Sequence, residues 1–248
     1  MAIRRHLKNA PIREAILDIR VRLPASVDHN RLLSVHPKIE RQYPDRQVQW
    51  KGQFEIPLGE SDVRKPASIE KGINGYLYRS AKDKQIAQFR LDGFTFNKLK
   101  PYDKWESFRD EARRLWELYI EAASPECITK IALRYINHLF VPGPLIDFDD
   151  YLTEGPKVPK NLPQGVSSFL TRVVVNEPEI NAIAIITQAL EKIIKPDIIP
   201  IILDIDAIKE GEFEAKGREV WETFEKLRHF KNRIFFESVT EKTLELFE

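Results

Sequence analysis

The fold is decided by two segments and the residues between them: Phe89-Arg-Leu-Asp-Gly-Phe-Thr-Phe-Asn-Lys-Leu-Lys-Pro-Tyr102 and Ile128-Thr-Lys-Ile-Ala-Leu-Arg-Tyr-Ile-Asn-His-Leu-Phe140. Apolar and polar residues alternate in both segments, which is typical of β-strands. Between them, apolar residues recur every three or four positions, which is typical of a helix. The stretch from Gln85 to Phe140 therefore predicts a strand, a helix and a second strand.

Two structures fit the phase change of the alternation at Asp92-Gly93. Asp-Gly is a favoured two-residue hairpin turn, which would pair Leu91 with Phe94. The same turn would pair Phe89 with Phe96 on the same face. Alternatively, one long strand carries a bulge at Gly93, because glycine tolerates positive φ. We favour the hairpin, and the sequence alone leaves both open.

A helix is predicted after Pro101-Tyr102, with Asp103 as its N-cap, Glu106 three residues later to complete a capping box, and Pro125 at its end. One stripe of this helix is apolar and holds Trp105, Phe108, Ala112, Leu115, Trp116, Tyr119 and Ala123. Each aromatic side chain on such a stripe removes roughly 150–250 Å² from water. We therefore expect a core helix lying on a sheet and not an aromatic ligand cage.

The strand that follows is mainly apolar on both faces, so we place it in the middle of the sheet. One face holds Ile131, Leu133, Tyr135, Asn137, Leu139 and Val141, and the other holds Ala132, Arg134, Ile136, His138 and Phe140. Arg134 and Asn137 are polar groups within this strand and need partners. We interpret them as members of a structural hydrogen-bond network. The alternative is a ligand contact.

Six motifs are spread over the chain: Asn9-Ala-Pro-Ile12, Glu14-Ala15, Leu91-Asp-Gly-Phe-Thr-Phe-Asn97, Pro101-Tyr102, Trp105-Glu106 and Leu133-Arg-Tyr-Ile-Asn137. In this combination the chain resembles an uncharacterised prokaryotic protein family of similar length, and the resemblance extends over nearly the whole chain. The family is sporadically distributed among bacteria and archaea and has no established activity. Such a distribution is typical of genes on mobile or defence loci, so the resemblance implies a genomic context and no mechanism.

The composition is that of an ordinary globular protein, with 42% hydrophobic and 31% charged residues among 248. The 39 Lys and Arg balance the 38 Asp and Glu, which gives no global attraction to nucleic acid or to a membrane. Cys127 is the only cysteine, which excludes an internal disulfide and fits a reducing cytoplasm. Arg4 and Arg5 lead into no apolar segment, and no apolar run approaches the roughly 20 residues of a membrane helix. We predict a cytoplasmic protein without a signal peptide or a membrane partner.

Further strands are predicted near residues 15–23, 48–58, 75–79, 169–175, 180–190 and 198–208. In the second of these, Trp50, Phe54 and Ile56 are expected to face inward. Helical segments are predicted from about Asp28, near Ala215 and over 240–247, and residues 59–74 are expected to form a loop.

Two pairs of short segments echo one another: Trp105-Glu-Ser-Phe108 with Trp221-Glu-Thr-Phe224, and Ile16-Leu-Asp-Ile19 with Ile202-Leu-Asp-Ile205. With the order of the elements, they favour a pseudo-duplicated unit. We predict an α+β fold in which helices pack on one face of an antiparallel sheet. It forms a single domain over 1–248, with two similar halves, 1–154 and 166–248, joined by the Pro-rich loop 155–165. The other face of the sheet is then available to a partner or ligand.

The sequence contains no phosphate-binding loop, no dinucleotide fingerprint and no nucleophile elbow, and its five histidines lack metal-ligand spacing. Asp204 and Asp206 are the one acidic pair of interest, because residues i and i+2 of a strand share a face about 7 Å apart. Two such carboxylates can share a Mg²⁺ ion for phosphoryl chemistry. The simpler interpretation is that both face solvent or cap the following turn.

A second candidate site is a basic hairpin with nearby aromatic residues: Tyr76, Tyr78, Arg79, Lys82 and Lys84. Aromatic and basic side chains on an open sheet can stack bases and hold phosphates. The near-neutral net charge argues against strong binding of nucleic acid, because affinity rests on phosphate neutralisation.

The first functional hypothesis is a non-enzymatic binding or regulatory protein that has no cofactor, binds an unknown protein partner and forms a homo-oligomer. Its candidate binding residues are Asp92, Asn97, Tyr102, Arg134 and Asn137. The alternatives are a Mg²⁺-dependent phosphoesterase or nuclease that uses Asp204 and Asp206, and a sheet that binds nucleic acid.

Overall fold

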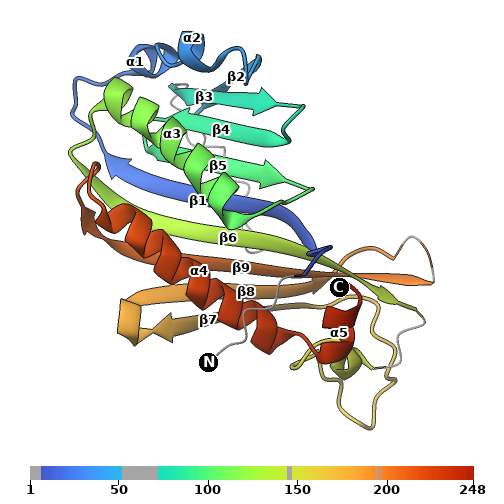
Figure 1. Cartoon of the computed structure of the whole chain (residues 1–248). Helices are drawn as coiled ribbons and strands as arrows, with labels where there is room; N and C mark the ends of the chain where they lie inside the picture. The colour runs from blue at the N-terminus through green and yellow to red at the C-terminus, as the bar shows by residue number, and fades with distance from the viewer. Residues whose placement is uncertain (1–6, 52–71, 144–146, 194, 196) are drawn as a thin grey trace, which may run out of the picture.

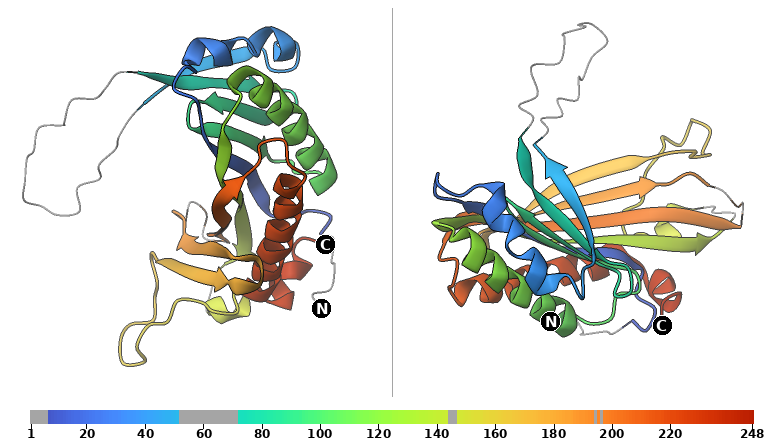
Figure 2. Two further views of the ribbon diagram at one scale, coloured as in Figure 1. Left: turned by 90° about the vertical axis from the view of Figure 1, so that its left-hand side faces the viewer. Right: turned by 90° about the horizontal axis from the view of Figure 1, so that it is seen from above.

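A computed structural model describes residues 7–51, 72–143, 147–193, 195 and 197–248. Nine strands form one sheet in the order β2-β3-β4-β5-β1-β6-β9-β8-β7, and every neighbouring pair is antiparallel (Figure 1). The two views of Figure 2 show that the sheet twists along its width. The predicted α+β class with a large antiparallel sheet is confirmed.

The strands are β1 (Ile12–Arg22), β2 (Asp45–Trp50), β3 (Ile73–Ser80), β4 (Gln85–Arg90), β5 (Gly93–Leu99), β6 (Cys127–Pro142), β7 (Leu170–Glu177), β8 (Ala182–Leu190) and β9 (Ile198–Phe213). The helices are α1 (His29–Leu33), α2 (His36–Ile39), α3 (Trp105–Ala123), α4 (Glu219–Ser238) and α5 (Glu241–Glu245), with single 3₁₀ turns at Phe148–Asp150 and Pro178–Ile180. Among the described residues, no helix combines the length and the apolar character that a membrane crossing needs.

Strand β6 lies in the interior of the sheet, between β1 and β9, as the sequence predicted. Its buried positions alternate, and Leu133 lies opposite Leu17 of β1 and Ala207 of β9. Helix α3 packs against β5, and α4 packs against β6 and β9. The core therefore lies between the sheet and the two long helices.

The segment around Asp92-Gly93 forms a hairpin, and the bulge alternative is wrong. The predicted register is also wrong by two residues, because Phe89 pairs with Phe94 and not with Phe96, and the turn is Leu91-Asp92, one residue earlier than predicted. Gly93 belongs to β5, where its φ is +150° and an added Cβ would overlap the backbone oxygen of Ile19 in β1. The glycine is thus needed for close strand approach, not for the turn.

Helix α3 buries all seven residues of the predicted apolar stripe. The predicted N-cap is wrong by one residue, because Lys104 is the cap and is the last residue with an extended backbone. Asp103 therefore lies one residue before the N-cap, outside the helix. Among the described residues, the Lys104 side chain makes no capping hydrogen bond.

The prediction that Trp50 faces inward is wrong, since its side chain is 63% exposed. The reason is that Trp50 ends β2, which is the edge strand of the sheet that the described residues form. Phe54 and Ile56 lie outside the described residues, as do Arg4, Arg5 and most of the predicted loop 59–74. The remaining predicted strands are present with bounds shifted by a few residues.

Candidate functional site

The face of the sheet opposite the buried core carries polar and charged side chains, which we call the polar face: Glu14, Asp18, Arg20, Gln88, Arg90, Thr95, Asn97, Lys130, Arg134, Asp204 and Asp206. Strand alternation produces this arrangement, because Asp18 stands between the buried Leu17 and Ile19. Pairing then aligns the polar positions across strands: Asp18 lies opposite Thr95, and Arg134 lies opposite Asp206.

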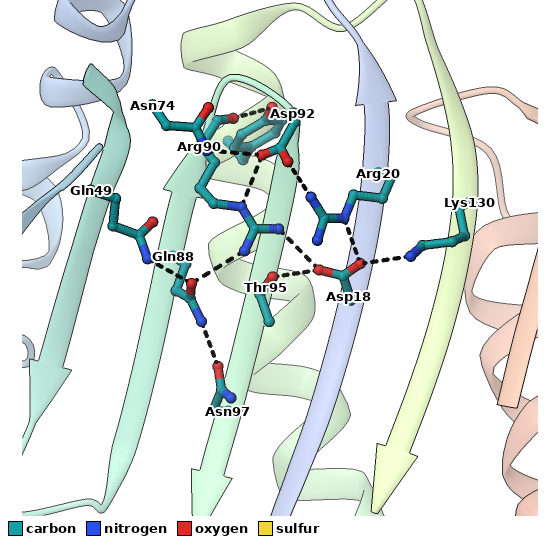
Figure 3. Close-up of polar contacts among 11 residues, drawn as sticks. Asp18, Arg20, Gln49, Asn74, Gln88, Arg90, Asp92, Thr95, Asn97 and Lys130 are labelled. Atoms are coloured by element: carbon teal, nitrogen blue, oxygen red, sulfur yellow. Dashed lines mark hydrogen bonds and ion pairs between the residues drawn. The ribbon is translucent and has the colours of Figure 1, made fainter. Parts of the chain in front are cut away.

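Asp18 is the centre of the polar face (Figure 3). Its Oδ1 accepts hydrogen bonds from Arg90 Nη2 at 3.0 Å and from Thr95 Oγ1 at 2.5 Å. Its Oδ2 accepts from Arg20 Nε at 2.9 Å and lies 3.8 Å from Lys130 Nζ. Burial acts to raise the pKa of Asp18, but the neighbouring cations and the Thr95 hydroxyl outweigh burial, and the net shift lowers that pKa. Asp18 is therefore a carboxylate at neutral pH.

Asp92, in the β4–β5 turn at the ends of these strands, binds the same two arginines (Figure 3). It forms an ion pair with Arg20, and its Oδ1 accepts from Arg90 Nε at 3.0 Å and from Asn74 Nδ2 at 3.4 Å. Each arginine thus joins the turn to Asp18 of β1. The Tyr119 hydroxyl of α3 donates to the backbone oxygen of Arg90 at 2.9 Å, which ties this corner to the buried core.

A chain of amides continues from this cluster toward β2. Gln49 Nε2 donates to Gln88 Oε1 at 2.8 Å, and Gln88 Nε2 donates to Asn97 Oδ1 at 3.2 Å. Asn97 Nδ2 then donates to Glu14 Oε1 at 2.7 Å. The polar side chains of β2, β4, β5 and β1 therefore form one hydrogen-bonded row with fixed orientations.

A second charged group joins β6 to β9. Arg134 binds Asp204 in a bidentate contact through one edge of the guanidinium, with Nε to Oδ1 at 2.9 Å and Nη2 to Oδ2 at 2.5 Å. Asp206 lies beside this pair, and its Oδ1 has no hydrogen-bond partner among the described residues. Burial raises the pKa of Asp206 despite the nearby Arg134. The Arg134 side chain is 43% exposed, so a ligand can reach the pair.

The arrangement of Asp204 and Asp206 gives little support to a metal site. Both oxygens of Asp204 are engaged by Arg134. Within the described ranges there is no group of three His, Cys, Asp or Glu side chains that could hold a metal ion. The Mg²⁺ hypothesis stays a prediction that lacks a third ligand in this part of the chain.

The five candidate binding residues fall into two groups. Asp92, Asn97 and Arg134 belong to the polar face. Tyr102 and Asn137 lie on the core side, where the Tyr102 hydroxyl is 2.8 Å from that of Tyr135, and burial raises the pKa of Tyr102 to about 12. Asn137 Nδ2 donates to the backbone oxygen of Leu203 at 3.0 Å. The structure does not bring the two groups together.

The residues of the basic hairpin are also divided. Tyr76 and Tyr78 are buried on the core side, where Tyr78 stacks on His36 with ring centroids 5.5 Å apart. Arg79 alternates with Tyr78 and therefore points to the other side of β3. Lys82 and Lys84 lie in and at the end of the β3–β4 turn. The buried rings are not placed to stack bases beside these cations.

Sequence reasoning did not identify Asp18, Arg20, Arg90 and Lys130 as site residues. The available signal was their position: each is a charged residue at the outward position of a strand whose alternate positions are apolar. Half-buried aliphatic residues were also missed on this face, among them Ile16, Ile136, Ile183, Ile185 and Ile202.

No protein-family model matches the chain. A search of curated proteins also finds no match.

Proposed function

We propose that this chain is a non-enzymatic binding or regulatory protein whose polar face binds a protein partner. In this proposal the helices cover one face of the sheet and leave the polar face free. The packing of α3 on β5 and of α4 on β6 and β9 supports it, as do the views of Figure 2. The single cysteine adds a cytoplasmic location to the proposal, and the family resemblance of the sequence motifs adds a mobile or defence locus.

We also propose that the sheet consists of two related units, β1 to α3 and β6 to α4. Each unit begins with a strand at the middle of the sheet, continues through a meander that runs from the sheet's outer edge inward, and ends in a long helix. The matching segments Trp105–Phe108 and Trp221–Phe224 both lie at the start of that helix. The repeat boundary then falls between α3 and β6, not at the Pro-rich loop 155–165.

The observation that carries the binding proposal is the composition of the polar face. Its charged centre contains both signs, already paired and oriented, and its β8–β9 side contributes half-buried isoleucines. Paired charges of both signs offer no excess positive potential for a polyanion such as nucleic acid. In protein interfaces, oriented charges provide specificity, and the apolar surface beside them is removed from water on binding.

The test removes the Arg134–Asp204 pair as a unit. Arg134→Ala alone would leave Asp204 beside Asp206 without its cation, which would confuse binding with stability. The double variant Arg134→Ala/Asp204→Asn leaves no unpaired charge from the pair. The matched control is Arg113→Ala/Glu117→Gln, which removes an exposed i,i+4 pair on α3, away from the polar face.

Each tagged protein is expressed in the source cells, purified, and analysed by mass spectrometry for proteins and by extraction for nucleic acid. We expect a stoichiometric protein with the wild type and the control, and its loss with the Arg134/Asp204 variant at an unchanged melting temperature. Retention of the partner by that variant contradicts binding through the polar face. Nucleic acid in place of a protein partner would favour the nucleic-acid alternative.

A further inference from the structure

The edge strand β7 exposes an unusual amount of apolar surface. Leu170, Val173, Val174 and Val175 are exposed at 72, 54, 48 and 36%, respectively. These residues lie on both faces of the strand, since Val173 and Val175 alternate with Val174. No other strand of the described residues pairs with the outer edge of β7, so its outward N–H and C=O groups are free to pair.

The equivalent strand of the first unit is protected. In the proposed two-unit arrangement β3 corresponds to β7, and β3 has β2 paired along its outer edge and α1 packed on its core side. Tyr76 and Tyr78 of β3 are consequently buried. The second unit ends at β7, where the positions of β2 and α1 have no counterpart among the described residues. Strand β7 therefore lacks a strand paired with its outer edge in the described part of the chain.

We infer that β7 pairs antiparallel with β7 of a second copy of this chain, which joins two sheets into one. The strand can pair with a second copy of itself, because its central residues are three consecutive valines and its two charges, Arg172 and Glu177, sum to zero. Closed two-fold dimers are the commonest oligomers, and their interface is self-complementary by necessity. A different protein donating a strand is the competing occupant.

Two-fold symmetry limits the possible registers of the β7–β7 pair, because the position of the axis along β7 determines which residues lie opposite each other. For an antiparallel pair of edge strands the axis is perpendicular to the sheet, so residues of the same face oppose one another. Centring the axis on Val174 places Val174 against itself and Val173 against Val175 of the other copy. In this register Arg172 faces Asn176 and Glu177 faces Thr171, so no like charges are opposed. Shifting the axis to Arg172 would oppose two arginines.

The experiment measures the mass of the full chain by light scattering and sedimentation equilibrium over a concentration series. We expect the wild type at twice the 29.0 kDa monomer mass. Val174→Glu and Val174→Lys, each alone, should be monomeric, because each places like charges directly opposite. An equal mixture of the two should recover the dimer, because the opposed charges then attract.

The mixing step separates a lost interface from a misfolded strand, since a misfolded variant cannot be rescued by another. Val48→Glu, an exposed valine on the opposite edge strand β2, is the matched control and should stay dimeric. A monomeric wild type, a Val174→Glu protein that stays dimeric, or a mixture that stays monomeric would each overturn the inference. Open-ended assemblies abolished by Val48→Glu would show pairing between β7 and β2 instead, and would also overturn it.

Discussion

Lys231 of α4 provides the sharpest thermodynamic prediction, because it is a buried amine without a carboxylate partner in the described structure. Its Nζ lies 3.6 Å from the centre of the Tyr135 ring. The hydroxyl of that ring forms a hydrogen bond with the Tyr102 hydroxyl. Burial, together with the positive charge of Arg228 one turn earlier as the smaller cause, lowers the pKa of Lys231 from 10.5 to about 7.

This pKa shift makes stability depend on pH in a definite direction. Between pH 7 and 10.5 the unfolded chain holds a proton on Lys231 that the folded chain has lost, so the free energy of unfolding rises with pH. Each pH unit within this window corresponds to about 1.4 kcal/mol. Because the native amine is half protonated near pH 7, we expect a gain of about 2 kcal/mol between pH 7 and 9.

The measurement is urea unfolding at several pH values from 7 to 9, followed by tryptophan fluorescence. Tyrosines such as Tyr102, with a native pKa of about 12, oppose the trend only once unfolded tyrosines ionise near pH 10. Lys231→Met keeps the length of the side chain without the titrating amine and should remove the slope. Lys226→Met, at an exposed position of α4, should keep the slope of the wild type.

Two results would refute this reasoning. A wild type with constant stability from pH 7 to 9 would mean that the Tyr135 ring holds Lys231 protonated, since cation–π attraction in a desolvated site reaches about 2 kcal/mol or more. An equal slope in Lys231→Met would assign the titration to another group.

Two further predictions concern the polar face and the sheet beneath it. Asp18→Ala should lower the free energy of unfolding by about 3–5 kcal/mol in urea at pH 7, since it removes the carboxylate that Arg20, Arg90 and Lys130 share; a loss below about 1 kcal/mol would show that Asp92 suffices. Gly93→Ala should cost more than about 1 kcal/mol, because a Cβ there overlaps the backbone oxygen of Ile19, whereas Gly165→Ala, which meets no atom within 4 Å, should stay within about 0.5 kcal/mol. Equal melting temperatures for the two glycine variants would contradict the close approach of β5 to β1.

Local patterns predicted the elements well because their causes are local. The stripe from Trp105 to Ala123 follows from helical periodicity, and the interior place of β6 in the sheet follows from apolar residues on both of its faces. The hairpin register failed because Gly93 has two possible uses, turn and close approach, and only the presence of β1 decides between them. The failure at Trp50 has the same origin, since an edge position is a property of the whole sheet.

The candidate site was predicted less well because it depends on register between distant strands. Asp18, Arg90 and Lys130 are separated by at least 40 residues along the chain and meet only once β4, β5, β1 and β6 are aligned. Arg134 and Asn137 were grouped as polar residues of one apolar strand, although their odd separation already placed them on opposite faces, where the structure also has them. The sequence predicts which residues of a strand share a face, but it does not predict how neighbouring strands are paired.

The proposed binding by the polar face and the proposed dimer through β7 are linked by geometry. A two-fold axis perpendicular to the sheet at β7 keeps both polar faces on the same side of the dimer, and Val174 itself belongs to that face because it pairs with Ile185. The half-buried isoleucines of β8 and β9 then lie on both sides of the seam, with one Arg134–Asp204 pair beyond them in each copy. A partner that contacts both copies gains from the second contact through effective concentration without any new interaction. If both proposals hold, self-association through β7 strengthens binding by the polar face, and loss of the dimer should weaken that binding even with every charged residue in place.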